Sequence, residues 1–502
     1  MFKANAEILN FSFSFTHHID PSSKTLSLSH KSRWFVYILF LLANILISLD
    51  HGSIPASTHP LRKIAGSDQA LGLFGSLVFV GNIIGSLISF WLINVVNRKT
   101  LLLLSLTLLS LCLFTFVLFT NIFFLFINRI LVGIFQSYVT IYLPVWCDQF
   151  GMLTKKSLMI TFGQLVVPIG VFLGYLIASV FINANVLNGW KVAFVIQGIG
   201  VILLSVVFIF IPKIYFHSTL YRSNTHTGSN YHDETVFTGI NIDISNHNER
   251  DNNTNNNNNN NFISIARVLL QHKVFLYAVL SLSSLFYVIT GVQYWVSDYM
   301  DNILHITSTK QRLLYFTIVC FTSPTFGVFL SGFVLTKIGG YEHKHSITYS
   351  FVLAFIAGCF AVAVPLVNDA EHFVFLLWLV LFFGGGVLPV ITGIIISCLP
   401  KHLAASGNSF TILIGNLFGY LPAPYIYGMF TDVFKDKGKI GMVFTMWYSF
   451  VGVAFMGVAA YYRYRYWERE REGKGGRYCG MEEEEGLILA ENNEMREQLL
   501  NE

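Results

Sequence analysis

Long apolar runs, separated by short polar loops, constrain this chain of 502 residues more than any other feature. Because the hydrocarbon core of a bilayer takes about 20 apolar residues per helix, each run is predicted to cross a membrane. The runs cover residues 34–54, 70–93, 101–120, 122–146, 158–182 and 190–211, and then 274–296, 313–335, 346–366, 373–399, 403–430 and 442–462. The sequence therefore predicts an all-α membrane protein with twelve transmembrane helices in two six-helix halves.

Composition agrees with a surface that lipid covers. Hydrophobic residues make up 54% of the chain and charged residues 12%, whereas a soluble protein carries about 25% charged residues. The net charge of +4 gives no support for a nucleic-acid partner. The six cysteines show no CxxC or Cys/His spacing, so neither a metal site nor a cofactor is predicted.

The polar segments divide the chain further. Residues 1–33 form a predicted cytoplasmic tail, and the run from Trp34 is interpreted as a permanent helix because no small-residue cleavage site follows it. Between the halves (34–211 and 274–462), residues 212–273 contain the asparagine run 255–261. They are predicted to be a disordered cytoplasmic linker, with a small regulatory module as the alternative. Residues 463–502 form a second predicted cytoplasmic tail. Lys and Arg near the tails and linker favour cytoplasmic termini.

Two charged residues lie well inside predicted helices, Asp50 in the first and Arg129 in the fourth. Placing a charge in a membrane costs about 2.5–3.5 kcal/mol on insertion scales, so such residues need an explanation. At about 1.5 Å per residue, both lie roughly 6–10 Å from the same membrane face, so they are close enough in depth to form an ion pair. One hypothesis is that Asp50 carries a proton or cation and is gated by Arg129. The alternatives are a pair that only pins two helices, and an Asp50 that faces an aqueous vestibule beside His51.

Gln136 follows Arg129 on the same helical face, near the middle of the membrane. As a neutral polar group it is suited to hydrogen-bond a substrate; a hydrogen bond between helices is the alternative. Further polar candidates for substrate binding are Asn44, Asn82, Tyr138, Gln164, Gln293 and Asn416. The sequence shows no ring of intramembrane Lys or Glu, which favours an amphiphilic, neutral or singly charged solute.

Several motifs resemble the major facilitator superfamily, in register, over nearly all of residues 34–462. Residues 129–138 (RILVGIFQSY) are similar to its R-x-x-x-G-x-x-E/Q pattern, and residues 163–174 resemble the glycine-proline motif of its fifth helix. Residues 90–99 (FWLINVVNRK) and 332–340 (GFVLTKIGG) resemble its loop motif, G-x-x-x-D-R-x-G-R-R/K, at corresponding places in the two halves. The resemblance implies a secondary transporter that works by alternating access, and not an enzyme.

Both copies of the loop motif depart from the family pattern. The acid, which tethers neighbouring helices in the family, is replaced by Asn94 in one copy and Thr336 in the other. The usual charged latch is therefore not implied. The candidate loop residues are Asn94, Asn97, Arg98, Lys99, Thr336, Lys337 and Gly339. Arg98 and Lys99 are hypothesised to contact helix ends or anionic headgroups; ordinary anchors at the membrane surface are the alternative.

Small residues recur at intervals of four on several predicted helices, which lets helix backbones approach closely. The glycines that are candidates for such packing are Gly81, Gly85, Gly133, Gly170, Gly174, Gly415 and Gly419. In the superfamily, helices 2, 5, 8 and 11 line the contact between the halves. The resemblance therefore implies that the small-residue faces of those helices meet where the two halves rock.

Within the superfamily, the first helix up to Asp50, the loop at Asn97 and residues 419–428 (GYLPAPYIYG) look most like the spinster-like branch, which is associated with lysolipids and sphingoid phosphates. That branch has an acid where this chain has Gln136, so coupling through two carboxylates is not expected. The leading hypothesis is a transporter of a small organic or lysolipid-like solute, surrounded by membrane lipids, with protons coupled through Asp50. The alternatives are a channel, a polytopic membrane enzyme, and a non-transporting scaffold or receptor on a transporter fold.

A short pattern in the C-terminal tail concerns location. Residues 483–488 (EEEGLI) fit an acidic dileucine sorting pattern, in which Glu483, Leu487 and Ile488 contact a sorting adaptor. The hypothesis is an endolysosomal or vacuolar pool of this integral, multi-pass membrane protein. The plasma membrane is the alternative.

Overall fold

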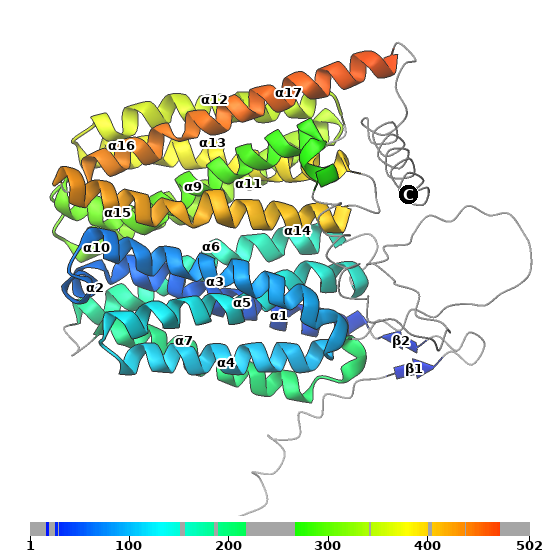
Figure 1. Cartoon of the computed structure of the whole chain (residues 1–502), viewed down its shortest axis with the longest axis horizontal. Coiled ribbons are helices and arrows are strands. Elements are labelled where there is room, and N and C mark those ends of the chain that lie inside the picture. The colour runs from blue at the N-terminus through cyan, green and yellow to red at the C-terminus, as the bar shows by residue number, and fades with distance from the viewer. Residues whose placement is uncertain are drawn as a thin grey trace, which may run out of the picture.

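The computed structural model describes residues 17–19, 26–28, 30–150, 156–184, 189–216, 267–340, 343–399, 404–436 and 438–471. Its long helices run along one common direction, and those from the first half of the chain lie beside those from the second (Figure 1). The predicted all-α membrane fold in two halves is confirmed. The end of the bundle that carries the helix α2 (Thr58–Ala65) is called the α2 end below. The opposite end, where α7 (Gly189–Phe210) ends and α9 (Lys273–Asn302) begins, is called the linker end.

The N-terminal half contains six long helices. They are α1 (His30–Ala56), α3 (Asp68–Val95), α4 (Arg98–Leu118), α5 (Ile122–Phe150), α6 (Lys156–Asn183) and α7 (Gly189–Phe210), followed by the short 3-10 helix η1 (Lys213–Tyr215). Their exteriors are apolar because lipid, and not water, faces them. Within this half, α1 packs mainly on α6 and α3 packs mainly on α5.

The C-terminal half has more interruptions. Its elements are α9 (Lys273–Asn302), α10 (Thr309–Thr317), the π-helix η2 (Ile318–Thr322), α11 (Ser323–Ile338), α12 (His345–Ala363), the 3-10 helix η3 (Val364–Leu366), α13 (Ala370–Ser397), α14 (Ala404–Gly415), the π-helix η4 (Asn416–Tyr420), α15 (Pro422–Phe434), α16 (Lys439–Trp447) and α17 (Ser449–Arg471). Here α11 and α12 pack on α13, and α17 packs on α9.

Eleven helical spans in the described residues are long and apolar enough to cross a membrane. The predicted run 403–430 is not one of them, because η4 and a turn at Leu421 divide it into α14 and α15. Pro422 and Pro424 explain the division, since proline lacks the N–H that continues a helical ladder and its ring crowds the preceding turn. Of the twelve predicted spans, eleven are confirmed, and the remaining run is helical in separate pieces.

Both π-helices stand just before a proline. The segment η2 precedes Pro324, and η4 precedes Pro422. A π turn widens the helix by one residue, which relieves the contact between the proline ring and the carbonyl of the turn before it. These two sites are therefore where the long helices of the C-terminal half depart from regular geometry.

Close glycine contacts hold each half together. A Cβ atom on Gly81 or Gly133 would overlap the backbone of the other helix in the α3–α5 pair, and Gly85 also faces α5. Similarly, Gly170 and Gly174 face the backbone of α1. In the other half, Gly415 and Gly419 face Phe286 and Ser283 of α9. All the candidate packing glycines thus lie against helices of their own half. The expectation that those on the second, fifth and eleventh spans lie between the halves is wrong, because a four-residue spacing fits any close helix pair.

Three other glycines lie at the seam between the halves. A side chain on Gly72 would overlap the carbonyl oxygen of Pro424 in α15, and one on Gly428 would overlap that of Asp68 in α3. Gly75 faces the ring of Tyr294 in α9. The closest approach of the two halves therefore joins α3 to α15 and α9 near the α2 end.

Elements outside the spans complete the described chain. Strands β1 (His17–Ile19) and β2 (Leu26–Leu28) pair antiparallel. The start of the predicted linker is packed, since the buried Tyr215 accepts a hydrogen bond at its carbonyl oxygen from Trp146 Nε1 at 2.9 Å. Helix α17 runs past the predicted last span to Arg471. Most of the predicted linker and the sorting pattern at 483–488 lie outside the described residues.

Candidate functional site

A buried ion pair joins α1 and α5 inside the N-terminal half. Arg129 Nη1 donates to Asp50 Oδ2 at 2.7 Å, and the two side chains are 1% and 0% exposed. A charge-assisted hydrogen bond of this length offsets part of the cost of removing both charges from water. The structure thus brings together the two residues that the sequence placed at similar depth.

A third helix fixes the arginine. Arg129 Nε donates to the carbonyl oxygen of Phe74 in α3 at 3.0 Å. The guanidinium therefore links α1, α3 and α5 at one point. Any change in the charge of Asp50 acts on the contact among all three helices.

The second oxygen of the carboxylate is poorly satisfied. Asp50 Oδ1 is buried and has no hydrogen-bond partner among the described residues. The ring of His51 is close to it, with Nε2 3.9 Å from this oxygen. Because buried polar atoms in proteins almost always find a partner, this oxygen is suited to accept a proton, a water or a ligand donor.

A stack of aromatic rings leads from this carboxylate across the seam. The ring of His51 stacks on Phe79 with centroids 5.6 Å apart, and Phe79 stacks on Tyr420 of η4 at 5.1 Å. Tyr420 in turn stacks on Phe286 of α9 at 4.5 Å. The stack therefore connects the neighbour of Asp50 with the π segment of the other half.

The predicted polar candidates fall into different environments. Gln136 Nε2 donates to Asn82 Oδ1 at 3.1 Å, while its buried Oε1 has no partner among the described residues. Asn44 and Asn416 each donate to a carbonyl of their own helix, at Phe40 and Ile412. Gln136 and Asn82 therefore keep an acceptor available, whereas the two asparagine amides are occupied locally.

The remaining candidates lie elsewhere. Tyr138 donates through its hydroxyl to the carbonyl oxygen of Arg98 at 3.1 Å, which places it near the linker end. Gln293 is half-buried in α9, between Val292 and the seam residue Tyr294. Gln164 lies in α6, but its side chain is outside the described part of the structure.

The loop motif of the N-terminal half caps two helices. Asn97 Oδ1 accepts from the backbone N–H of Lys99 and so caps the start of α4. Lys99 Nζ donates to the carbonyl oxygens of Ile209 and Ile211 at 2.7 and 2.6 Å. A cation at the C-terminal end of α7 is favourable because the helix dipole is negative there. Lys99 thus ties α4 to α7, as the hypothesis of helix-end contacts expects.

The copy in the C-terminal half lacks such a tie in the described residues. Lys337 Nζ lies 4.7 Å from the ring centroid of Phe333, and Thr336 donates to the carbonyl of Gly332. Gly339 ends α11 with φ +109°, a left-handed conformation that favours glycine. Asn94 lies in the last turn of α3, and its side chain is outside the described part.

Polar contacts between the halves close the α2 end. Arg62 of α2 donates from Nε to Asp68 Oδ1 at 2.6 Å and from Nη2 to Asp298 Oδ2 at 2.9 Å. Burial opposes the charge of Arg62, but the hydrogen bond and charge of Asp298 and the charge of Asp68 outweigh it and raise the pKa of the guanidinium. Because the pKa moves upward, Arg62 loses its charge only in strongly alkaline solution and is a cation throughout the physiological pH range.

A second contact reinforces the first. Asp432 of α15 accepts hydrogen bonds from the backbone N–H groups of Asp68 and Gln69 at 3.0 and 2.7 Å. Tyr294 donates to the carbonyl of Leu71, and Gln69 Nε2 donates to the hydroxyl of Tyr425, both at 2.5 Å. Sequence reasoning missed this cluster, because its acids stand at the ends of apolar runs and resemble ordinary loop residues.

The linker end is different. Between described residues, all hydrogen bonds and ion pairs that join the halves lie toward the α2 end. The helix α15 packs on α3, whereas α14, nearer the linker end, packs on α9, η4 and α13 of its own half. Among the described residues, the polar contacts between the halves are thus confined to one end of the bundle.

Comparison with known families and structures gives a consistent result. The sequence pattern described as the Major Facilitator Superfamily matches residues 34–424. No curated protein sequence matches the chain. A bacterial homologue of the human lysosomal transporter Spinster, solved in inward-facing unoccupied and occupied conformations, is similar with a TM-score of 0.66 and 15% identity, over 86% of this chain and 98% of that one.

A second solved structure has the same architecture. A D-xylose-proton symporter is similar with a TM-score of 0.62 and 17% identity, over 86% of this chain and 97% of that one. At such identities the likeness concerns the fold. It agrees with the two-halved arrangement in Figure 1.

Proposed function

The chain belongs to the Major Facilitator Superfamily, a family of transporters, and on that premise we propose that it moves a small organic or lipid-like solute by alternating access, coupled to protons through Asp50. The observation that carries the proposal is the buried ion pair whose carboxylate keeps one oxygen without a partner among the described residues. An intramembrane acid of this kind is a functional candidate by default.

Protonation of Asp50 supplies the coupling step. A neutral carboxyl group attracts the guanidinium of Arg129 less strongly than a carboxylate does, so the contact that joins α1, α3 and α5 loosens. The stack from His51 to Tyr420 offers a route by which this change reaches the seam. The D-xylose-proton symporter of similar fold supports proton coupling as a property that this architecture accommodates.

The conformation supports alternating access. With both termini in the cytoplasm, the α2 end faces away from the cytoplasm and is closed by Arg62 and Asp432. Polar contacts between the halves at the α2 end are what an inward-facing state requires, and the Spinster homologue of similar fold was solved in such a state. Alternating access requires the opposite arrangement as well, in which the contacts at the α2 end break.

The polar lining favours a solute with little charge. Gln136 and Asn82 present a neutral pair, and the guanidinium of Arg129 is already paired with Asp50. Such groups suit hydrogen bonding to a hydroxyl, amide or zwitterionic head. A lysolipid-like solute is the preferred substrate class, in line with the spinster-like features of the sequence.

A reconstituted flux assay tests this function. Purified protein in proteoliposomes is given lysophosphatidylcholine or D-xylose under an imposed pH gradient, and the internal pH is followed with an enclosed dye. We expect solute-dependent proton movement in the parent, its loss in Asp50→Asn, and normal behaviour in the control Asp369→Asn, whose carboxylate is exposed. Solute flux with unchanged proton movement in Asp50→Asn would show that coupling lies elsewhere. A parent without any solute flux would contradict transport of both solute classes.

We also propose an endolysosomal or vacuolar pool. The support is the sorting pattern at Glu483, Leu487 and Ile488. Replacing Leu487 and Ile488 by alanine should move the protein to the plasma membrane, as measured by surface biotinylation. An unchanged distribution would show that no adaptor uses the pattern.

A further inference from the structure

A groove on the surface that faces the lipid lies away from the ion pair. It has a volume of about 490 Å³ and is formed by Tyr315 of α10, Ile318 of η2, and Glu371, Val374, Phe375 and Trp378 of α13. This volume falls within the range of about 300–1,000 Å³ that is typical of small-molecule sites. Phe375 is 61% exposed, so one wall is open to the surrounding bilayer.

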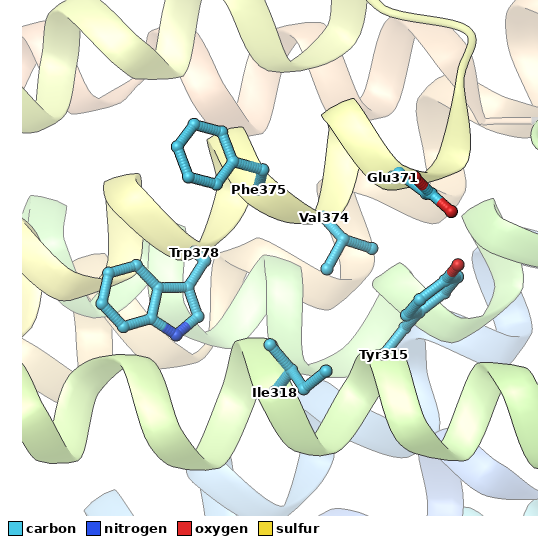
Figure 2. A pocket seen from close by; sticks show the side chains of 6 residues that line it. All are labelled: Tyr315, Ile318, Glu371, Val374, Phe375 and Trp378. Atoms are coloured by element: carbon cyan, nitrogen blue, oxygen red, sulfur yellow. The ribbon is translucent and has the colours of Figure 1, made fainter.

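The helical register sets the order of the groups along the groove. Residues 371, 374, 375 and 378 are spaced as one face of a helix. Because Glu371 lies in the first turn of α13, it stands at the α2 end, and Trp378 lies about 10 Å deeper at 1.5 Å per residue. Figure 2 shows the carboxylate of Glu371 near the hydroxyl of Tyr315 at one end of the groove, and the indole of Trp378 toward the other.

The deep part is rigid and apolar. Trp378 Nε1 donates to Thr322 Oγ1 at 3.0 Å, and its carbonyl oxygen accepts from Ser323 Oγ at 2.6 Å. These bonds satisfy the polar atoms of the tryptophan, so it offers the groove only its ring face. Together with Ile318 and Val374, the ring forms walls that suit a hydrocarbon chain and no polar ligand.

The shallow part carries an unneutralised charge. No Lys, Arg or His nitrogen among the described residues lies within 4.0 Å of the Glu371 carboxylate, since His372 pairs with Asp369 and Arg312 pairs with Asp301. Tyr315 accepts from Gln311 Nε2 at 3.0 Å, which leaves its own O–H available to donate. A carboxylate beside an aromatic ring is a suitable receptor for an ammonium group.

We propose that this groove binds a single-chain amphiphile with a cationic amine head, the chain lying against Trp378 and the ammonium group beside Glu371. The order of charge and hydrocarbon matches that of an amphiphile at a membrane surface, with its head at the α2 end and its chain toward the bilayer centre. The site shares no residue with the ion pair of Asp50 and Arg129.

The test compares two photoactivatable probes in the full chain reconstituted in lipid nanodiscs. Both carry the same diazirine-bearing alkyl chain, and they differ only in a primary amine or a hydroxyl head. Labelled residues are located by mass spectrometry after irradiation. We expect the amine probe to label the segment from Val374 to Trp378 about fivefold more than the hydroxyl probe does, the upper range for an exposed charge pair.

Three variants sharpen the comparison. Glu371→Gln should lower amine labelling to the level of the hydroxyl probe, while Glu468→Gln, an exposed acid at the linker end, should change nothing. Val374→Trp should fill the groove and lower labelling by both probes. Equal labelling by both heads in the parent, or amine labelling that survives Glu371→Gln in correctly folded protein, would overturn the proposal and leave only general contact with lipid.

Discussion

The Oδ1 atom of Asp432 accepts a hydrogen bond from the backbone N–H of Asp68, 3.0 Å away, so a residue of one half caps a helix of the other. The second oxygen takes the N–H of Gln69, and the side chain of Ser67 takes that of Ala70. The first N–H groups of a helix have no partner within the helix. At the start of α3, those of Asp68 and Gln69 are satisfied by Asp432 only while the two halves are together.

This cap predicts the effect of Asp432→Asn. The variant loses a charge at the positive end of a helix dipole and one of two acceptor oxygens, which should destabilise the closed α2 end by about 1–3 kcal/mol. A cysteine at position 297, buried at the seam here, should then react faster with an impermeant maleimide. The matched control is Asp436→Asn, because Asp436 caps residues of its own half at the same end. Equal rates in both variants would contradict a role in closure.

The ion pair predicts an asymmetry between its two partners. Arg129→Ala leaves a carboxylate buried without its cation and should destabilise the protein by about 3–5 kcal/mol, whereas Asp50→Asn keeps a neutral acceptor and should cost less. Thermal unfolding in detergent measures both. The comparison variant is Arg312→Ala, whose pair with Asp301 is partly exposed and should contribute about 0–1 kcal/mol. A tolerated Arg129→Ala would mean that the pair is not desolvated.

Glycine substitutions separate packing from gating. Gly81→Leu forces α3 away from α5 and should lower stability by at least about 1–3 kcal/mol. A leucine at position 72 would overlap α15 of the other half at Pro424. Gly72→Leu should therefore leave the thermal midpoint nearly unchanged but prevent closure of the α2 end. Maleimide labelling at position 297 measures that closure. Gly332→Leu, with open space at its Cβ, is the control for both. A Gly72→Leu variant that closes normally would place the seam elsewhere.

Lys99 provides a local prediction. Lys99→Met removes the donor to Ile209 and Ile211, so the last turn of α7 should fray and lose about 1–2 kcal/mol of protection. Hydrogen exchange with mass spectrometry on the peptide that covers residues 205–216 measures this loss. Lys337→Met serves as the control, because among the described residues Lys337 contacts only a ring of its own helix. Unchanged exchange in Lys99→Met would reduce Lys99 to a surface anchor.

The sequence predicted the spans well and their partners poorly. Hydropathy locates a span because lipid imposes it, and the depths of Asp50 and Arg129 follow from counting residues along two helices. By contrast, the spacing of Gly81 and Gly85 indicates only that another helix packs closely there. It does not indicate which helix, and in the structure that helix is α5. In the sequence, the acids at 68, 298 and 432 resemble ordinary residues at the ends of spans. Only the fold brings them beside Arg62 and the start of α3. Pro422 gave a visible signal that its span is divided.

The π segment η4 separates two stretches of chain with different neighbours, α15 against α3 and α14 within its own half. A widened turn followed by a proline lacks part of the ladder that stiffens a helix, so bending there takes less work than elsewhere. We therefore expect the helical segment formed by α14, η4 and α15 to bend at η4, which acts as a hinge. In that motion α15 stays packed on α3 while α14 changes its direction. A small change of angle at η4 then becomes a large displacement at the far membrane face.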